Sequence, residues 1–594
     1  GDGDLERVSH YEVESHTLII RPRIPLAPGA QYAVLLTRGI RGWTFDEEGE
    51  LTLASIRSPF LMKSHAVQGQ DVSRAATLAG VDTSDLAFGW TFTTSEILRP
   101  LLRLRQGVWG EGVLARMADR ELGFVEVRDT DIRIDGDTNQ DGVVDVDGDH
   151  PLILQGDYMA EAFSIVGFVQ QGFELRFDHV DYFVFGSLQT PDVRTGELRT
   201  VGVNTESGAG QVDTETVPFL LAVPEATEHH SPPFPVMVYF HGTSTSRMEM
   251  VAVADAMAKQ GIASLSFDQV GHGPIIPDIY LALKNAGVGL DLIEILAPEI
   301  AGLLVPELKD EFEGLEAHES LEKLANVGFW RELAHIGRTT DENGDGSLES
   351  SESFFFANPF RLCSSFWQDL VDFFTIVRTL RGLEASALPP ALDDPSSASI
   401  SALRERALLG DFNADGVLDI GGPDVQISVA GTSLGGFHAA MAAALEPEVT
   451  VATPIVSGGG MSDVIGRSSL HFIIRPILLE VVGPVVVGCD DGQGGLFLSW
   501  NDEADRCDDE VKVERSFAHL PDVPVGTLVT VRNLDNDEVA NSSVTEDGRV
   551  AVSIPADRWD LVEIVVGEPD EPLATIPILT PYEGLGLPRN APRF

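Results

Sequence analysis

Short apolar runs separated by amphipathic stretches dominate the centre of the chain. Residues 236–240 (VMVYF) and 263–267 (ASLSF) are runs of apolar and small residues, as expected for strands buried on both faces of a sheet. Between them, 248–260 has the spacing of an amphipathic helix. A third run, 425–430, is followed by a glycine-containing turn and by 437–445, a helix of small residues. Strands that alternate with helices predict an α/β fold whose sheet is parallel, with right-handed crossovers.

The flanking regions have different patterns, which divide the chain into six predicted parts. Residues 1–97 and 489–575 have the turn spacing of small β-sandwich-like domains, the second inserted into the α/β domain. Residues 275–420 lack strand signals and contain predicted helices at 279–304, 315–335 and 366–383, so we expect a helical cap there. The core is therefore split into 98–274 and 421–488, and 576–594 is a Pro- and Gly-rich tail leading to a missing C-terminal segment.

The turn after 425–430 carries the pattern G-x-S-x-G, formed by Gly431, Ser433 and Gly435. A sharp strand-to-helix turn lifts a serine hydroxyl above the sheet, and glycines on both sides allow close backbone contact. The amide of Leu434, at the helix N-terminus, would then point to the place where an oxyanion forms. The same five residues also occur as a plain Gly-Ser turn, but the flanking strand and helix favour Ser433 as a nucleophile.

Three acidic loops have the spacing of calcium-binding loops, in which oxygen ligands recur at alternate positions around a central glycine. The loop 341–352 fits D-x-[DN]-x-[DN]-G-x5-E throughout, whereas 411–419 and 137–145 share its first nine positions and resemble the calcium loops of dockerin-type modules. We expect these loops to bind calcium and to pin the cap to the core, although solvated acidic turns would give a similar pattern. The predicted ligands are Asp341, Asn343, Asp345, Ser347, Glu349, Glu352, Asp411, Asn413, Asp415, Asp419, Asp424, Asp137, Asn139, Asp141, Asp145 and Asp149.

Charge and cysteine content restrict the partners and the compartment. The 93 acidic and 40 basic residues give a net charge of −53, which repels nucleic acid and suits a salty or calcium-rich medium. Among the three cysteines, Cys489 and Cys507 bracket an acidic loop and could pair, whereas Cys363 is expected to be a buried thiol. The most apolar run, 476–487, is too short to span a membrane. We expect a secreted or cell-surface protein whose signal peptide would precede Gly1.

Two sets of motifs resemble known families. The segments LIIRPRIPLAPGAQYAVLLTRGIRG, SPF and FGWTFTTSEI resemble the N-terminal domain of large secreted bacterial lipases of the virulence-factor lipase type. His241-Gly242, Asp268-x-x-Gly-His272-Gly and the Ser433 turn occur in the order seen in α/β-hydrolases. That resemblance implies an esterase or lipase with Ser433 as nucleophile and a second oxyanion donor from the amide of Gly242 or Thr243. It also implies a mostly structural role for Asp268 and His272.

The catalytic acid and histidine are not evident in the sequence. After Ser433 the chain offers His438, expected to face the core, and then His471 and His519. We therefore expect these residues, with the last strands of the sheet, on a C-terminal fragment of the same precursor; the alternative within the chain pairs Asp463 with His519.

The function predicted from these features is hydrolysis of a small-molecule or lipid ester through an acyl-enzyme on Ser433. Two alternatives remain open: a non-catalytic, calcium-dependent surface or matrix scaffold, and a serine peptidase with the same nucleophile.

Overall fold

The computed structural model describes the chain in segments, and it separates two compact units, residues 1–100 with 591–594 and residues 101–590. The described segments are 9–12, 17–20, 26–45, 51–55, 66–130, 152–156, 159–160, 176–196, 198–273, 309–326, 330–334, 336–340, 359–392, 398–458, 485–491, 495–500, 513–516, 523–545, 548–557, 560–569 and 571–579, with the single positions 22, 24, 298, 301, 302, 328, 348, 350, 351 and 395.

In the first unit, strands pair two by two within the described segments. The pairs are β1 (Ser9–Glu12) with β2 (Thr17–Ile20), β3 (Gln31–Thr37) with β6 (Leu86–Thr93), and β4 (Arg41–Phe45) with β5 (Leu51–Ser55), all antiparallel. Helix α1 (Ala66–Ala79) packs Val72 and Ala76 against β3 and β6, followed by the short helix η2 (Thr83–Asp85). The β-sandwich expected for 1–97 thus remains a prediction.

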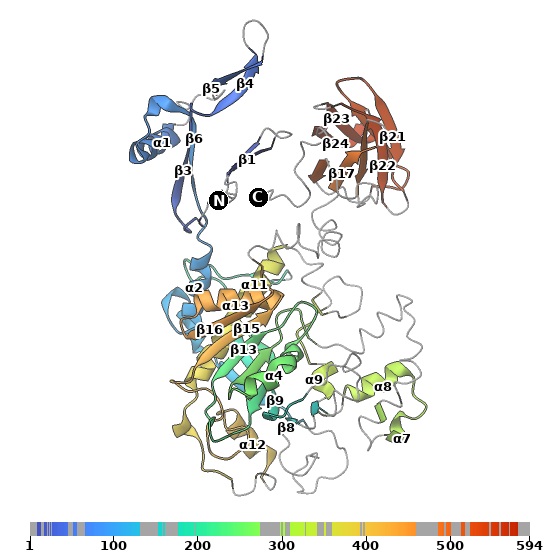
Figure 1. The fold of residues 1–594 in the computed structure, drawn as a ribbon. Helices are drawn as coiled ribbons and strands as arrows, with labels where there is room; N and C mark the ends of the chain where they lie inside the picture. Colours follow the sequence, from blue (N-terminus) through green and yellow to red (C-terminus); the bar gives the residue numbers. More distant parts are fainter. Residues whose placement is uncertain are drawn as a thin grey trace, which may run out of the picture. The chain divides into compact units, whose positions relative to one another are not determined.

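The second unit is built on an eight-stranded mixed sheet (Figure 1). Its strand order is β16-β15-β13-β14-β12-β9-β7, with β8 paired to β9. The bounds are β7 (Gly123–Val127), β8 (Leu154–Gln155), β9 (Val180–Asp192), β12 (Asp213–Pro224), β13 (Val236–Phe240), β14 (Ala263–Phe267), β15 (Ile427–Thr432) and β16 (Val449–Ile455). A separate short hairpin joins β10 (Arg194–Thr195) and β11 (Thr200–Val201).

The sheet is parallel in only one part, which corrects the expectation of a parallel sheet. Strands β14, β13, β15 and β16 run parallel, whereas β12 pairs antiparallel with both β14 and β9. The pairing of β9 with β12 extends over nearly the whole of both strands. The direction in which two strands pair depends on the chain between them, so the apolar pattern of each strand alone does not specify it.

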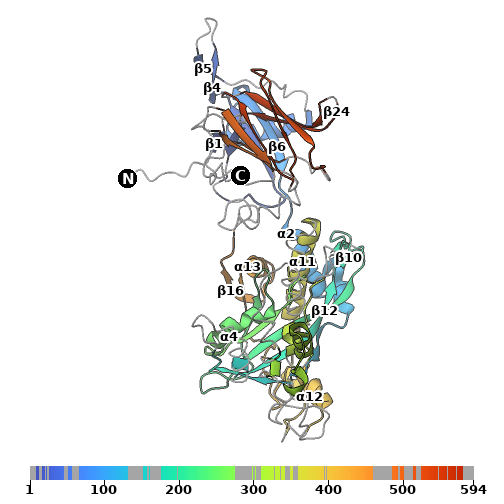
Figure 2. The same ribbon diagram turned by 90° about the vertical axis from the view of Figure 1, so that its right-hand side faces the viewer.

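Helices cover both faces of this sheet (Figure 2). One face packs against α2 (Leu98–Val108), η3 (Gly112–Asp119), α11 (Pro359–Gly382), α12 (Ile400–Ala407) and α13 (Leu434–Leu445). The other packs against η4 (Arg247–Met250) and α4 (Val251–Ala258). The apolar cluster on this side also includes Phe312 of α7 (Lys309–Phe312), Leu324 of α8 (Ala317–Leu324) and Trp330 of α9 (Trp330–Ala334). A short helix, η6 (Ala385–Ala387), follows α11.

Helix α11 requires a correction to the predicted cap at 275–420. Residues 368–377 of this helix are all buried, and the helix packs on the sheet itself because Leu370, Phe373, Phe374 and Val377 belong to its core. Cys363 was expected to be buried but is exposed, since it precedes this buried stretch in the first turns of α11. The predicted helix at 279–304 lies almost entirely outside the described residues.

The C-terminal β region forms two four-stranded antiparallel sheets that share one apolar core. One sheet has the order β19-β17-β18-β22 and the other β21-β20-β23-β24. The bounds are β17 (Val485–Asp490), β18 (Gly495–Trp500), β19 (Val513–Ser516), β20 (Leu528–Asn533), β21 (Val539–Ser543), β22 (Val550–Pro555), β23 (Leu561–Glu568) and β24 (Glu571–Leu579). In this region Cys489 is disulfide-bonded, whereas Cys507 lies outside the described residues. No helix in the described part of the chain is long and apolar enough to cross a membrane.

Candidate active site

Ser433 lies at a sharp turn between β15 and α13. Its backbone has φ 55° and ψ −111°, a conformation that non-glycine residues rarely adopt, and the residue is exposed. Strained backbone of this kind costs about 1–3 kcal/mol and persists only where surrounding contacts enforce it. Here the Ser433 amide donates to the carbonyl of Ile455 at the end of β16, at 3.0 Å. This hydrogen bond from the neighbouring strand β16 therefore holds the turn in its strained conformation.

The two motif glycines are required by close backbone contact. A Cβ atom on Gly431 would lie 2.3 Å from the carbonyl oxygen of Gly435. One on Gly435 would lie 2.0 Å from the carbonyl oxygen of Phe240, at the end of β13. Real side chains do not approach backbone atoms so closely, so both positions accept only glycine. The pattern G-x-S-x-G thus marks the place where the β15 turn packs against β13.

The first amide of α13 is available as a hydrogen-bond donor. Leu434 begins the helix directly after Ser433, and its N–H makes no hydrogen bond within the described part of the chain. Amides in the first turn of a helix have no intrahelical acceptor and favour negative charge. The Leu434 amide is therefore free to donate a hydrogen bond next to Ser433, and its role as an oxyanion donor stays a prediction.

The loop after β13 is fixed by His241, which is fully buried. Its Nε2 accepts a hydrogen bond from the amide of Gln269 at 3.0 Å, which places the proton on Nδ1, 2.8 Å from the Gly242 carbonyl oxygen. Burial lowers the pKa of His241 to about 4. The imidazole therefore stays neutral near pH 7 and acts as a brace between the loops that follow β13 and β14.

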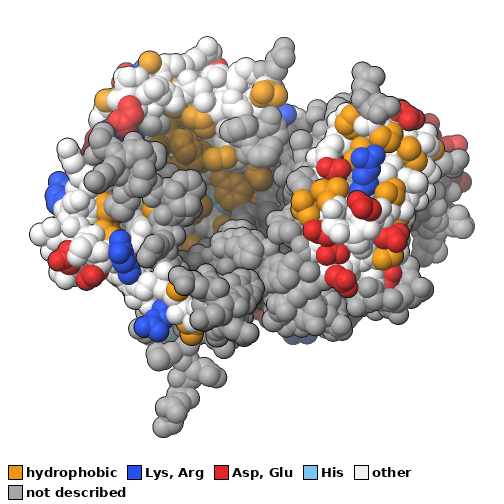
Figure 3. Space-filling view, turned by 90° about the horizontal axis from the view of Figure 1, so that it is seen from above, with side chains coloured by type: hydrophobic (Ala, Val, Ile, Leu, Met, Phe, Trp, Pro, Cys, Tyr) orange, Lys and Arg blue, Asp and Glu red, His pale blue; other side chains and the backbone are white. Residues whose placement is uncertain are grey.

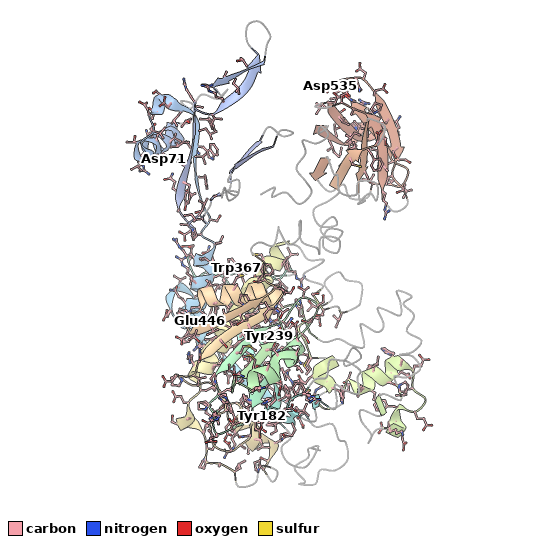
Figure 4. The ribbon with its side chains drawn as sticks, in the orientation of Figure 1. Asp71, Tyr182, Tyr239, Trp367, Glu446 and Asp535 are labelled. Atoms are coloured by element: carbon pink, nitrogen blue, oxygen red, sulfur yellow. The ribbon has the colours of Figure 1, made fainter. Side chains whose placement is uncertain are left out.

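The carboxylate of Glu249 lies beside the serine turn and was not identified from the sequence. Its Oε2 accepts hydrogen bonds from the Gly242 amide at 2.8 Å and from the Thr245 hydroxyl at 2.6 Å. The other oxygen, Oε1, accepts the Tyr239 hydroxyl at 2.9 Å. The Tyr239 oxygen lies 2.7 Å from the hydroxyl of Thr432, which directly precedes Ser433, and Figure 4 places Tyr239 on the sheet close to α4.

This network determines which amides are free near Ser433. A Cβ on Gly242 would lie 3.7 Å from the Ser433 Cβ, so the two loops are adjacent. The Gly242 amide is bonded to Glu249, whereas the Thr243 amide makes no hydrogen bond in the described segments. Of the two predicted donors, Thr243 is the one available here. No local motif pointed to Glu249, since only the fold brings it to Gly242.

Asp268 and His272 hold loops together and do not contact Ser433. Asp268 is fully buried and forms a salt bridge with Arg247, whose amide also donates to it at 2.7 Å. His272 is buried, with its Nδ1 2.9 Å from the Val270 carbonyl oxygen. Burial lowers the pKa of His272 to about 3, and His241 nearby adds to the effect. These contacts agree with the structural role expected for both residues.

The described residues do not provide a base for Ser433. His438 faces the core as expected: it stacks between the rings of Phe240 and Phe366, and its Nε2 lies 3.2 Å from the Asp369 carboxylate. No histidine in the described part of the chain makes a hydrogen bond with Ser433. The other candidates, Asp463, His471 and His519, lie outside the described residues.

An apolar cavity of about 230 Å³ lies along the sheet next to α4. Its lining includes Met237 and Tyr239 of β13, Met257 of α4, and Ile455 of β16. Tyr239 and Ile455 also make the hydrogen bonds that hold the Ser433 turn. The cavity therefore brings apolar surface close to the candidate nucleophile.

Of the three predicted calcium loops, only 411–419 is described in full. Asp137, Asn139, Asp141, Asp145, Asp149, Asp341, Asn343, Asp345, Ser347, Glu349 and Glu352 lie outside the described residues. Within the described ones, no three Asp, Glu, His or Cys side chains gather in a preformed metal site. Burial raises the pKa of Asp419 to about 7, and the carboxylates of Asp415 and Asp411 add to the effect.

Asp424 does not lie in the loop that it was expected to complete. The chain leaves that loop when Gly422 donates its amide to the carbonyl of Leu380 in α11, at 2.7 Å. Asp424 follows this turn and is exposed.

Comparisons with known proteins leave the family open. No family model matches the chain, and no curated protein matches its sequence. It is similar to a ligand-bound form of the rice cell wall degrading esterase LipA from Xanthomonas oryzae, with 11% identity and a TM-score of 0.16 over 56% of this chain and 94% of that one. It is also similar to a PEG-bound cold-adapted esterase from an Arctic intertidal metagenomic library, with 11% identity and a TM-score of 0.12 over 49% and 94%. Similarity this low does not indicate the function of the chain.

Proposed function

We propose that this protein is a serine hydrolase that cleaves carboxylic esters. The observation that carries the proposal is the conformation of Ser433, which is strained, exposed and directly followed by a free helix N-terminal amide. An exposed serine on a strained strand-to-helix turn is the arrangement that places a hydroxyl for attack on a carbonyl. The resulting oxyanion would receive hydrogen bonds from the amides of Leu434 and Thr243.

The apolar cavity supports an ester with an apolar acyl or alcohol group as the substrate class. Its lining includes Tyr239 and Ile455, which lie next to the Ser433 turn. An ester whose apolar group occupied the cavity would therefore have its carbonyl near Ser433. Water would then release the acyl group from Ser433, as in other acyl-enzyme reactions.

A fluorophosphonate probe tests this proposal directly. We expect the probe to label Ser433 in the wild type and to leave Ser433→Ala unlabelled, with ester hydrolysis reduced at least about 10³-fold. Ser457→Ala is a matched control, because Ser457 is also exposed and lies near Gly436. Absence of labelling in a folded chain supplied with every part of its precursor would instead favour the non-catalytic scaffold. Relative rates on p-nitrophenyl esters and on peptides would separate an esterase from a serine peptidase.

We further propose that a C-terminal segment of the precursor completes the sheet and supplies the acid and the histidine. Two observations support this proposal: β16 is an edge strand within the described sheet, and its Ala452 and Pro454, which alternate with the cavity-lining residues of this strand, are exposed. Edge strands with exposed apolar side chains tend to be covered by further chain. Labelling of Ser433 in residues 1–594 alone, at a rate typical of serine hydrolases, would show that the base lies within this chain.

Secretion or display at the cell surface is proposed as the location. It is supported by the disulfide at Cys489, because disulfides persist in oxidising compartments. Mapping the disulfide in protein isolated from its natural source tests this proposal, and a free thiol at Cys489 would argue against it.

A further inference from the structure

The loop Asp411–Asp419 lies at the end of the sheet opposite to Ser433. The amide of Phe234, two residues before β13, donates to the Asp419 carbonyl at 2.8 Å, and Ile420 forms a parallel bridge with Phe234. The loop therefore meets the amino ends of the parallel strands, whereas Ser433 follows a carboxyl end. Six residues of β15 separate the two ends, a distance of about 20 Å at roughly 3.3 Å per residue.

Two of the loop's carboxylates, those of Asp411 and Asp419, accept hydrogen bonds from backbone amides of the loop itself. Oδ2 of Asp411 accepts the Gly416 amide across the loop at 3.1 Å, and Oδ2 of Asp419 accepts the Phe412 amide at 2.7 Å. Gly416 has φ 80°, and a Cβ there would lie 2.6 Å from the backbone nitrogen of Ala391. A bulkier residue could not make this turn.

Within the described part of the chain, the second oxygen of Asp411 has no hydrogen-bond partner. The Asp411 side chain is 0% exposed, and its Oδ1 makes no hydrogen bond, whereas Oδ2 also receives Arg406 at 3.1 Å. A buried charged oxygen without a hydrogen bond destabilises the fold, because it has lost its hydration and gained no partner in return. When all three carboxylates are ionised, they and the Arg406 guanidinium have a net charge of −2, which one divalent cation neutralises.

We propose that this loop binds a single calcium ion through Asp411 Oδ1 and further oxygens of Asn413, Asp415, Val417 and Asp419. These residues occupy positions one, three, five, seven and nine of the loop, the order in which calcium loops supply ligands, with the carbonyl at position seven. The carboxylates are not gathered in advance, so the ion draws Asp415 and Asp419 toward Asp411. Calcium suits this loop better than magnesium because it tolerates irregular geometry around oxygen ligands.

The bound ion would stabilise the fold without taking part in ester hydrolysis. The loop contacts the segment after α11, where the Leu392 amide donates to the Ala414 carbonyl at 3.1 Å, as well as α12 and the start of β13. The ion would thus hold three parts of the second unit together. The proposal is independent of the proposed reaction, since neither its site nor its test involves Ser433.

Calcium stoichiometry in variants of the full chain tests the site. After removal of metal with a chelator, equilibrium dialysis against ⁴⁵Ca²⁺ should show one equivalent fewer for Asp415→Ala than for the wild type. Glu405→Ala, which removes an exposed carboxylate from neighbouring α12, should match the wild type. The difference between variants is the readout, because other acidic loops can bind calcium as well. Equal stoichiometry in Asp415→Ala and the wild type would overturn the proposal.

Hydrogen exchange on the wild-type chain provides a second measurement that needs no variant. Calcium should slow amide exchange at least about tenfold in peptides covering residues 411–420, and magnesium at the same concentration should slow it less. Unchanged exchange in these peptides upon addition of calcium would also refute the site.

Discussion

At the scale of single residues, the backbone of Ser433 has a strained conformation that stability alone does not explain. Its φ of 55° places a side chain in a region that suits glycine. The hydrogen bond to Ile455 and the close packing of Gly435 against Phe240 hold the turn in this conformation. Selection for stability alone would favour glycine at such a position. The serine is therefore best explained by its hydroxyl.

Replacement of Ser433 by glycine should stabilise the protein while it removes the proposed nucleophile. Relief of the backbone strain should raise the free energy of unfolding by about 1 kcal/mol or more, although glycine's greater freedom in the unfolded chain offsets part of the gain. Ser433→Ala keeps the Cβ and hence the strain, so its stability should stay close to that of the wild type. Urea denaturation of the three proteins measures this difference, and a Ser433→Gly variant less stable than Ser433→Ala would contradict the explanation.

At the scale of elements, Tyr239 and Glu249 connect the turn after β15 with the start of α4. The hydrogen bonds run from Thr432 through the Tyr239 hydroxyl to the Glu249 carboxylate, and from there to the Gly242 amide. Burial raises the pKa of Tyr239, so the phenol stays protonated and continues to donate. One network of hydrogen bonds thereby joins the two loops that lie next to Ser433.

A double-mutant cycle should detect this connection. Glu249→Gln removes the charged acceptor of the Tyr239 hydroxyl and the Gly242 amide, and it should lower the free energy of unfolding by about 1–3 kcal/mol. Tyr239→Phe should lower it by about 1 kcal/mol. Because the two side chains share a hydrogen bond, the double variant should be more stable than the sum of the single effects predicts, by about 0.5–3 kcal/mol. Strict additivity in denaturant unfolding would mean that the network is not coupled.

The buried histidines after β13 and β14 should make the second unit sensitive to acid. The folded-state pKa of His272, about 3, lies below its ordinary value of 6.5, as does that of His241, about 4. Between pH 6.5 and the folded-state pKa of each histidine, the unfolded chain binds protons that the folded chain does not bind. Stability is therefore fully present above pH 6.5 and is lost as the pH falls toward 4 and then 3.

Comparison with His272→Asn isolates one of these groups, because asparagine can still donate to the Val270 carbonyl. Between pH 7.5 and 5 the wild type should lose about 2 kcal/mol of unfolding free energy relative to the variant, at about 1.4 kcal/mol per pH unit below 6.5. Asp372, whose pKa burial raises to about 6, changes stability in the opposite direction, but it does so in both proteins. Parallel curves of stability against pH would show that His272 is not held neutral.

The apolar pattern predicted the central strands well because they are buried on both faces. Residues 236–240 and 263–267 correspond to β13 and β14, and the glycine pattern located the turn at Ser433. The antiparallel pairing of β9 with β12 was not evident, since pairing direction is set by distant contacts. Glu249 and the place of α11 in the core were missed for the same reason.

At the scale of the whole molecule, the net charge of −53 is the dominant feature. Figure 3 shows acidic side chains interspersed with basic and hydrophobic ones on the described part of one face. Buried arginines such as Arg247 and Arg338 already pair with carboxylates in the core, so they do not offset the surface charge further. Repulsion among like charges works against the compact state, and dissolved salt screens it.

The folded protein should therefore gain stability as salt is added. Raising NaCl from about 0.05 to 0.5 M shortens the screening length from over 10 Å to roughly 4 Å, so the melting temperature should rise by several degrees at pH 7.5. Calorimetry in calcium-free buffer separates this effect from metal binding. The same series near the isoelectric point, about 4.4, is the control, because the net charge is then close to zero and the rise should largely disappear. An equal rise at both pH values would assign the effect to general salting-out of apolar surface, and a fall at pH 7.5 would mean that ion pairs outweigh the repulsion.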